Sequence, residues 1–192
     1  MATLFATVYN RFLGKITDDM YLELTPEDTI KDLQNLIVDA IPGFEFPRQN
    51  LYDYEIKIQE IGEDELLPDD FVLGTVWGEI PEIDANQVPR VIVDRSRFGI
   101  NLTSEEVNIL ALLMKQGWVQ RQVASIENTR MKYSGADFKM TSQANHLSKL
   151  LNLLEESRRD SFHMQRLYKR RKLSDSGYKS NWSILGETSV FD

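Results

Sequence analysis

The chain has 192 residues, of which 42% are hydrophobic and 27% charged, and its formal net charge is -8. This length favours one domain with a buried core, and the absence of cysteine excludes disulfides, thiolate catalysis and zinc sites built on sulfur. No apolar run approaches the roughly 20 residues that span a bilayer, and no basic segment leads into an apolar secretory core, so we expect an intracellular or particle-bound protein without a membrane partner.

Residues 1–51 predict a helical hairpin that packs against the rest of the fold. The apolar side chains of residues 3–16 have helical spacing, and Asp18-Asp19 ends that pattern. Thr25-Pro26-Glu27-Asp28 then predicts a second helix start, with a hydroxyl cap, proline at the first helical position and acids in the first turn. Pro42-Gly43 ends this second helix.

Residues 52–102 predict an acidic, β-rich insert. Ile56, Ile58 and, less regularly, Ile61 alternate with polar residues, which is the period of a half-buried strand. Further β-rich runs at 71–77 and 90–93 are separated by glycine and proline. An alternative is a ubiquitin-like β-grasp over residues 4–75. The helical spacing of the apolar residues in 3–16 disfavours it.

Residues 103–171 predict two long helices that form the core. Thr103-Ser104-Glu105-Glu106 is typical of a capped helix start. The following helix is apolar on nearly all sides in its middle, which predicts burial on several sides. Small polar residues and a glycine at 133–137 end it, and a second helix begins near Thr141 or Ser142. The predicted core side chains are Val107, Leu110, Met114, Trp118, Leu147, Leu150 and Leu154. Leu151, Phe162 and Tyr168 continue the apolar stripe of the second helix.

Residues 172–192 predict an extended docking tail. Turn formers at Asp175-Ser176-Gly177 precede large apolar side chains that are too few and too irregular to build a core. Leaving them in water is unfavourable by roughly 1.5–3 kcal/mol each. The tail therefore either folds back or docks on a partner, and we favour docking. The predicted docking residues are Arg166, Tyr168, Lys169, Arg170, Arg171, Tyr178, Trp182, Ile184, Leu185 and Phe191.

The sequence offers no pattern for catalysis. His146 and His163 are the only histidines and are not spaced as paired ligands, and His146 fits a structural role better than a catalytic one. The acidic runs lack the spacing of a calcium loop, and neither a phosphate cradle nor a nucleophile motif is present. We therefore expect no enzyme activity, no cofactor and no metal site.

Charge differs between the two halves of the chain. Residues 1–102 carry -12 from 8 Lys/Arg and 20 Asp/Glu, whereas residues 103–192 carry +4 from 14 Lys/Arg and 10 Asp/Glu. Such asymmetry suggests different partners for the two ends. The basic helix end could contact a nucleic-acid backbone without reading its sequence.

Several segments together resemble a known group of proteins. In chain order they are Ser104 to Trp118 (SEEVNILALLMKQGW), Val123 to Asn128 (VASIEN), Asp137 to Leu151 (DFKMTSQANHLSKLL) and Tyr168 to Arg171 (YKRR). They resemble small structural proteins from the head-to-tail junction of tailed bacteriophages, and residues 9–16 and 39–41 also fit. The resemblance covers about two thirds of the chain, and residues 52–102 depart from it.

This resemblance, with the helix and strand patterns, implies a mainly α fold: a helical bundle with two long C-terminal helices, a β-rich insert and an extended C-terminal arm. It also implies a non-enzymatic virion protein, made in the host cytoplasm, that forms a homo-oligomeric and commonly twelvefold ring. The ring would join the portal protein to the tail and line the DNA exit channel. The alternative is a non-structural acidic phage protein, ubiquitin-like or another interaction module, that binds a host protein.

Overall fold

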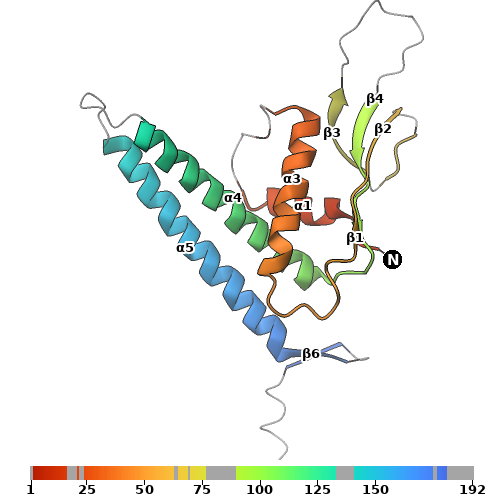
Figure 1. Cartoon of the computed structure of the whole chain (residues 1–192). Helices are drawn as coiled ribbons and strands as arrows, with labels where there is room; N and C mark the ends of the chain where they lie inside the picture. Colours follow the sequence, from red (N-terminus) through yellow and green to blue (C-terminus); the bar gives the residue numbers. More distant parts are fainter. Residues whose placement is uncertain are drawn as a thin grey trace, which may run out of the picture.

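A computed structural model shows a mainly helical chain with a small β part (Figure 1). It describes residues 2–16, 21, 24–62, 65–68, 70–76, 90–132, 141–174 and 177–180. The long helices α4 (Ser104–Lys132) and α5 (Thr141–Arg170) run side by side in opposite directions. The shorter helices α1 (Phe5–Leu13) and α3 (Pro26–Ala40) pack against α4. In the described ranges, no helix has the length and apolar composition of a membrane span.

Helix α1 is shorter than the predicted segment 3–16, because the residues before it join the β part. The Thr3 N–H donates to the Ile100 carbonyl at 2.9 Å, and the Phe98 N–H donates to the Thr3 carbonyl at 2.8 Å. Leu4 forms an isolated bridge with Arg97. Because residues 5–13 are helical, the β-grasp alternative is wrong.

Helix α3 has the predicted boundaries. The Thr25 side chain accepts the Asp28 N–H at 3.2 Å, and Pro26 is the first helical residue. The helix ends at Ala40, and a single 3-10 turn, η1 (Ile41–Gly43), follows it.

The insert contains five short antiparallel strands. They are β1 (Tyr54–Glu55), β2 (Ile58–Gly62), β3 (Phe71–Val76), β4 (Arg90–Asp94) and β5 (Arg97–Phe98). β1 pairs with β5, and a second sheet has the order β2-β4-β3. The insert is therefore β-rich over the part that is described.

The predicted strand is present as β2, but the prediction that Ile56, Ile58 and Ile61 share its buried face is wrong. Ile56 precedes β2, and Ile58 is 40% exposed whereas Ile61 is buried. Ile58 and Ile61 are three residues apart, so they lie on opposite faces of the strand. Only Ile61 joins a buried cluster, with Val91 and Val93.

A buried polar pair joins the helices to β4. The Tyr9 hydroxyl donates to Asp94 Oδ2 at 3.0 Å, and Asp94 Oδ1 accepts the Ser96 N–H at 2.8 Å. Burial, and then the charge and hydrogen bond of Asp94, raise the pKa of Tyr9 well above its usual range. Tyr9 therefore stays a neutral donor, and the buried carboxylate keeps its partner.

Helix α4 is the centre of the core. The Glu106 N–H donates to the Thr103 hydroxyl at 3.3 Å, and Glu106 Oε2 accepts the Thr103 N–H at 2.7 Å, which is a reciprocal capping box. All residues from Ile109 to Met114 are buried, as the apolar pattern predicts. The main buried cluster joins α4 to side chains of α1, α3 and α5.

Helix α5 faces α4 with a mixed surface. After Leu154, its buried positions are Ser157, Ser161, Gln165 and Tyr168. Phe162 follows Ser161 and is therefore about 100° further round the helix, where it is 50% exposed. Phe162 and the exposed Leu151 do not belong to the buried stripe, so that part of the prediction is wrong.

The chain reverses direction after α5. β6 (Arg171–Ser174) pairs antiparallel with β7 (Gly177–Ser180), and Ser174 lies opposite Gly177. The predicted tail, residues 172–192, therefore begins with a hairpin. Its remaining residues, 181–192, lie outside the described part of the chain.

Candidate interaction site at the C-terminal end of α5

Tyr168 fixes the end of α5 to the start of α4. Its side chain is fully buried, and its hydroxyl donates to Glu106 Oε1 at 2.5 Å. The other oxygen of this carboxylate belongs to the capping box of α4, so Glu106 serves both helices. Burial, and then the hydrogen bond to Glu106, raise the pKa of the Tyr168 phenol above its usual value.

Arg48 caps the C-terminus of α5. Its guanidinium donates to the Tyr168 carbonyl at 3.0 Å and also to the Arg171 carbonyl. The last carbonyls of a helix have no partner within the helix, so these bonds satisfy otherwise free acceptors. The guanidinium carbon also lies 4.3 Å from the centroid of the Tyr168 ring, in a cation–π arrangement.

The segment before Arg48 completes this attachment. Gln165 Oε1 accepts the Glu45 N–H at 2.8 Å, and Gln165 Nε2 donates to the Gly43 carbonyl at 3.2 Å. Phe44 packs edge to face on Tyr168, with ring centroids 5.4 Å apart. We name the set Phe44, Arg48, Glu106, Gln165 and Tyr168 the α5 anchor. The prediction that Tyr168 docks on a partner is wrong in this fold, because its side chain is enclosed by the anchor.

Exposed cations surround the α5 anchor. Arg166, Lys169 and Arg170 are exposed, and in the part of the chain that is described none of them has a carboxylate within ion-pair distance. Lys169 Nζ lies 3.9 Å from the centroid of the Phe46 ring, which is itself exposed. Arg171 instead pairs with Glu105 at 2.8 Å.

The β6–β7 hairpin follows these cations in the chain. In its backbone register, Lys172 lies opposite Lys179 and Leu173 lies opposite Tyr178. We name Arg166, Lys169, Arg170, Arg171 and this hairpin the basic end. Of the predicted docking residues, Trp182, Ile184, Leu185 and Phe191 lie outside the described residues.

The insert presents a second surface of different character. Five of the nine exposed large hydrophobic side chains of the described chain belong to it, namely Tyr52, Ile56, Ile58, Leu66 and Leu67. Arg95 orders the loop between β2 and β3, because it contacts Asp70 at 3.0 Å, Gln59 at 2.8 Å and the Glu65 carbonyl at 3.4 Å. The hydrogen bond from Arg95 lowers the pKa of Asp70.

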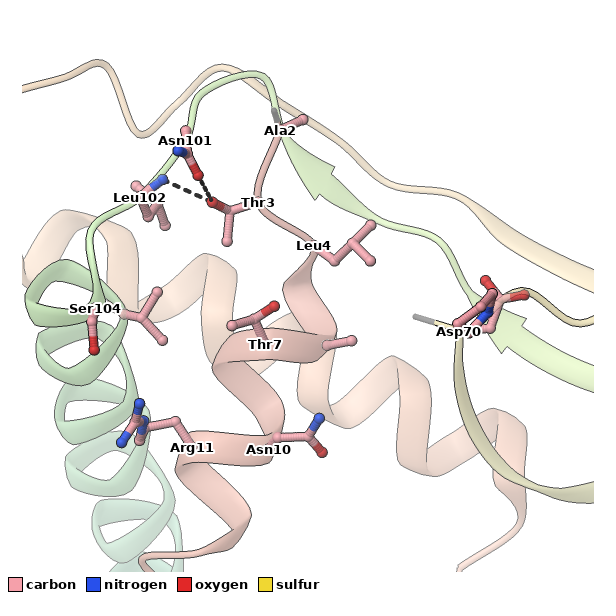
Figure 2. Close-up of a pocket in the computed structure, with 13 residues that line it drawn as sticks. Ala2, Thr3, Leu4, Thr7, Asn10, Arg11, Asp70, Asn101, Leu102 and Ser104 are labelled. Atoms are coloured by element: carbon pink, nitrogen blue, oxygen red, sulfur yellow. Dashed lines mark hydrogen bonds between the residues drawn. The ribbon is translucent and has the colours of Figure 1, made fainter.

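A cavity of about 580 Å³ lies between α1 and the start of α4 (Figure 2). Thr7, Asn10 and Arg11 line it from α1, and Ser104 lines it from α4. Among the described lining residues the one carboxylate is Asp70, which is held by Arg95. These described residues include no paired acid and base, so they give no geometric basis for assigning a reaction to the cavity.

The described residues contain no group of three His, Asp or Glu side chains placed to hold a metal ion. His146 and His163 are both exposed on α5.

The predicted core residues are distributed unevenly. Val107, Leu110, Met114, Trp118 and Leu154 belong to the main buried cluster. Leu147 is buried on α5 outside this cluster, and Leu150 is only half-buried, so its assignment to the core is wrong.

No sequence pattern pointed to Arg48, Phe46 or Gln165, although each contributes to the site. Gln165 contacts Glu45 and Gly43, which lie 120 and 122 positions earlier in the chain. Only the run Phe44-Glu45-Phe46, with two aromatic residues outside any periodic pattern, could have drawn attention to this segment.

No protein-family model matches the chain, and neither a curated protein nor a solved structure matches it.

Proposed function

We propose that this chain is a non-enzymatic structural protein of a phage head-to-tail connector. Copies of it would form a homo-oligomeric ring in the virion, twelvefold as in the proteins it resembles, between the portal protein and the tail. The observation that carries the proposal is the α5 anchor, because it holds a cluster of exposed cations at the end of a long helical pair. Of the segments that carry the resemblance, 104–118 and 123–128 lie on α4, 141–151 lies on α5, and 168–171 lies at the basic end, whereas 137–140 lie outside the described residues.

A connector of this kind would work by mass action. A single contact between one copy and the portal can be weak, since the contacts of a symmetric ring form together and later ones are effectively intramolecular. The hairpin and the residues after it would reach the portal. Cations at the basic end that face the channel would contact the phosphates of passing DNA without sequence preference.

The insert favours a second candidate function, an acidic phage protein that binds a basic host protein. Residues 52–102 carry -8 from 4 Lys/Arg and 12 Asp/Glu, and they include exposed apolar side chains such as Tyr52 and Leu67. Exposed apolar side chains in an acidic segment fit a protein partner. A protein with this function would act in the infected cell and would be missing from particles.

Quantitative mass spectrometry of purified particles of the source phage separates the two functions. We expect about one copy of this chain per portal subunit, because each portal subunit would hold one connector subunit. Absence of the chain from particles that contain portal protein would refute the connector proposal and leave the host-binding function.

A further inference from the structure

We propose that the cavity between α1 and the start of α4 binds a small phosphate monoester. The phosphate group would lie beside Arg11, and the rest of the molecule would lie against the apolar part of the wall. This function goes beyond the connector, because none of the described lining residues belongs to the α5 anchor or to the basic end. Each copy of the chain would bind the ligand by itself.

The cavity has the size of a site for a small molecule. Its volume of about 580 Å³ lies within the range of roughly 300–1,000 Å³ that is usual for such sites. The buried side chains of Ala6, Leu102 and Val107 form an apolar part of the wall, whereas Thr7 and Arg11 are exposed. Inorganic phosphate would fill only a small part of this volume, so we expect a ligand that also has a neutral or apolar body.

Arg11 brings to this wall a charge that no neighbouring acid neutralises. Among the described residues, no Asp or Glu lies within ion-pair distance of its guanidinium. Figure 2 shows the Arg11 side chain reaching from α1 toward α4, where the Ser104 hydroxyl points toward it. Both groups can donate to phosphate oxygens, and the planar guanidinium can donate to two of them at once. This end of the cavity therefore offers donors to an anion.

Two lysines add to the positive charge around Arg11. Burial, and then the charges of Arg11 and Lys115, lower the pKa of Lys15, whereas the charge of Asp160 opposes this shift. Arg11 and Lys115 thus both lie within electrostatic range of Lys15. Three cations and one acid leave a net charge of +2 among these described residues. A phosphate monoester carries about -1.5 to -2 at neutral pH, which matches this charge better than the single charge of a carboxylate does.

The acids near the cavity are engaged with other groups. Asp70, the carboxylate of the described wall, is held by Arg95 at 3.0 Å. In the first turn of α4, Glu105 pairs with Arg171, and Glu106 belongs to the α5 anchor. These carboxylates are compensated by their own partners, so they oppose an anion beside Arg11 less than free acids would.

The wall of the cavity is ordered before a ligand arrives. Thr3 Oγ1 accepts the Leu102 N–H at 2.7 Å, and the Thr3 hydroxyl donates to Asn101 Oδ1 at 3.4 Å, as Figure 2 shows. The Thr3 N–H also donates to the Ile100 carbonyl at 2.9 Å. These bonds join the segment before α1 to the segment before α4, which holds the two sides of the cavity together. A site that is already ordered loses less conformational freedom on binding.

Isothermal titration calorimetry on the full chain tests the site with phenyl phosphate. Inorganic phosphate and benzoate are the comparison ligands, because the first lacks the ring and the second has a carboxylate in place of the phosphate. Phenyl phosphate should bind at a single site per chain and more tightly than either comparison ligand.

Substitutions at exposed positions locate the binding site. Arg11→Met removes the charge and keeps a long side chain, so it should weaken the binding of phenyl phosphate by about 10- to 100-fold, the loss expected for a hydrogen bond between charged groups. Thr7→Trp puts a large side chain on the wall and should remove binding. The matched control is Arg158→Met, because Arg158 is an exposed arginine of α5 that does not line the cavity; it should bind like the wild type. Circular dichroism should show the helical signal of the wild type in every variant.

A wild type that does not bind phenyl phosphate in the millimolar range would overturn the proposal. So would a folded Arg11→Met or Thr7→Trp variant with the affinity of the wild type, because the ligand would then lie outside the cavity. Benzoate that binds as tightly as phenyl phosphate would make the ligand a carboxylate. Inorganic phosphate that binds as tightly would remove the role of the apolar wall, and either result would overturn the assignment to a phosphate monoester.

Discussion

Replacing Tyr168 by phenylalanine tests the α5 anchor at a single atom. The substitution keeps the ring that packs on Phe44 and lies under Arg48, and it removes only the hydroxyl that donates to Glu106. Glu106 is buried, and it keeps only the hydrogen bonds from Thr103. A hydrogen bond to a charged group contributes about 1.5–3 kcal/mol, so we expect the free energy of unfolding to fall by about that amount.

Urea unfolding measures the free energy and thermal unfolding measures the Tm, and both are followed by far-ultraviolet circular dichroism. For a chain of this size, about 1 kcal/mol lowers the Tm by roughly 2–4 °C, so the expected shift is roughly 3–12 °C. Tyr52→Phe is the matched control, because Tyr52 is 66% exposed and its hydroxyl can bond to water; it should change stability by less than about 0.5 kcal/mol. Equal stabilities of Tyr168→Phe and Tyr52→Phe would refute the buried hydrogen bond of the Tyr168 phenol. They would also refute the fixed position of the end of α5.

The same hydroxyl predicts how stability depends on alkaline pH. The pKa of Tyr168 is raised in the folded state above its ordinary value of 10.0. The protonated phenol therefore contributes its full stabilisation below the pKa that it has in the unfolded chain. This stabilisation is lost as the pH rises from that value toward the higher pKa of the folded chain. Above about pH 10, each such group lowers stability by about 1.4 kcal/mol per pH unit. Tyr168→Phe should therefore show a shallower loss than the wild type, whereas an unchanged slope would contradict the raised pKa.

Three other predictions concern the core, the tail and the insert. Trp118→Ala should lower the free energy of unfolding by about 3–5 kcal/mol, because it empties a buried site. Trp118→Phe should lower it much less, because it keeps an aromatic ring and the indole N–H has no hydrogen-bond partner in the described structure. Equal losses for the two variants would contradict this packing. Truncation after Lys172 keeps the anchor, so the helical circular-dichroism signal should remain while binding to the portal is lost, and a lost signal would place the tail in the core. Because the pKa of Asp70 is lowered from its ordinary value of 3.8, ionised Asp70 stabilises the folded chain at pH values above 3.8, and this contribution is lost as the pH falls through the folded pKa. Asp70→Asn should therefore reduce the loss of stability at acid pH. An unchanged loss would contradict the role of Arg95.

The features that the sequence determined are those in which a residue interacts with a neighbour a few positions away. Thr25 caps α3 through Asp28, and Thr103 and Glu106 cap α4 reciprocally, as each pattern predicts. The continuous apolar run from Ile109 to Met114 also determined that α4 would be buried on several sides. These interactions lie within one helical turn, so the chain specifies them without knowing what packs against it.

The tertiary structure decided which side chains are available to a partner. The sequence placed Tyr168 both in the apolar stripe of the second helix and among the docking residues. The fold decided between the two, because it brings Tyr168 to Glu106, which is 62 positions away in the chain. Contact with α4 likewise selected Ser161 instead of the neighbouring Phe162 for burial. Periodicity gives the faces of a helix but not the neighbour that each face meets. The position of Arg171 beside Glu105 therefore follows only from the folded chain.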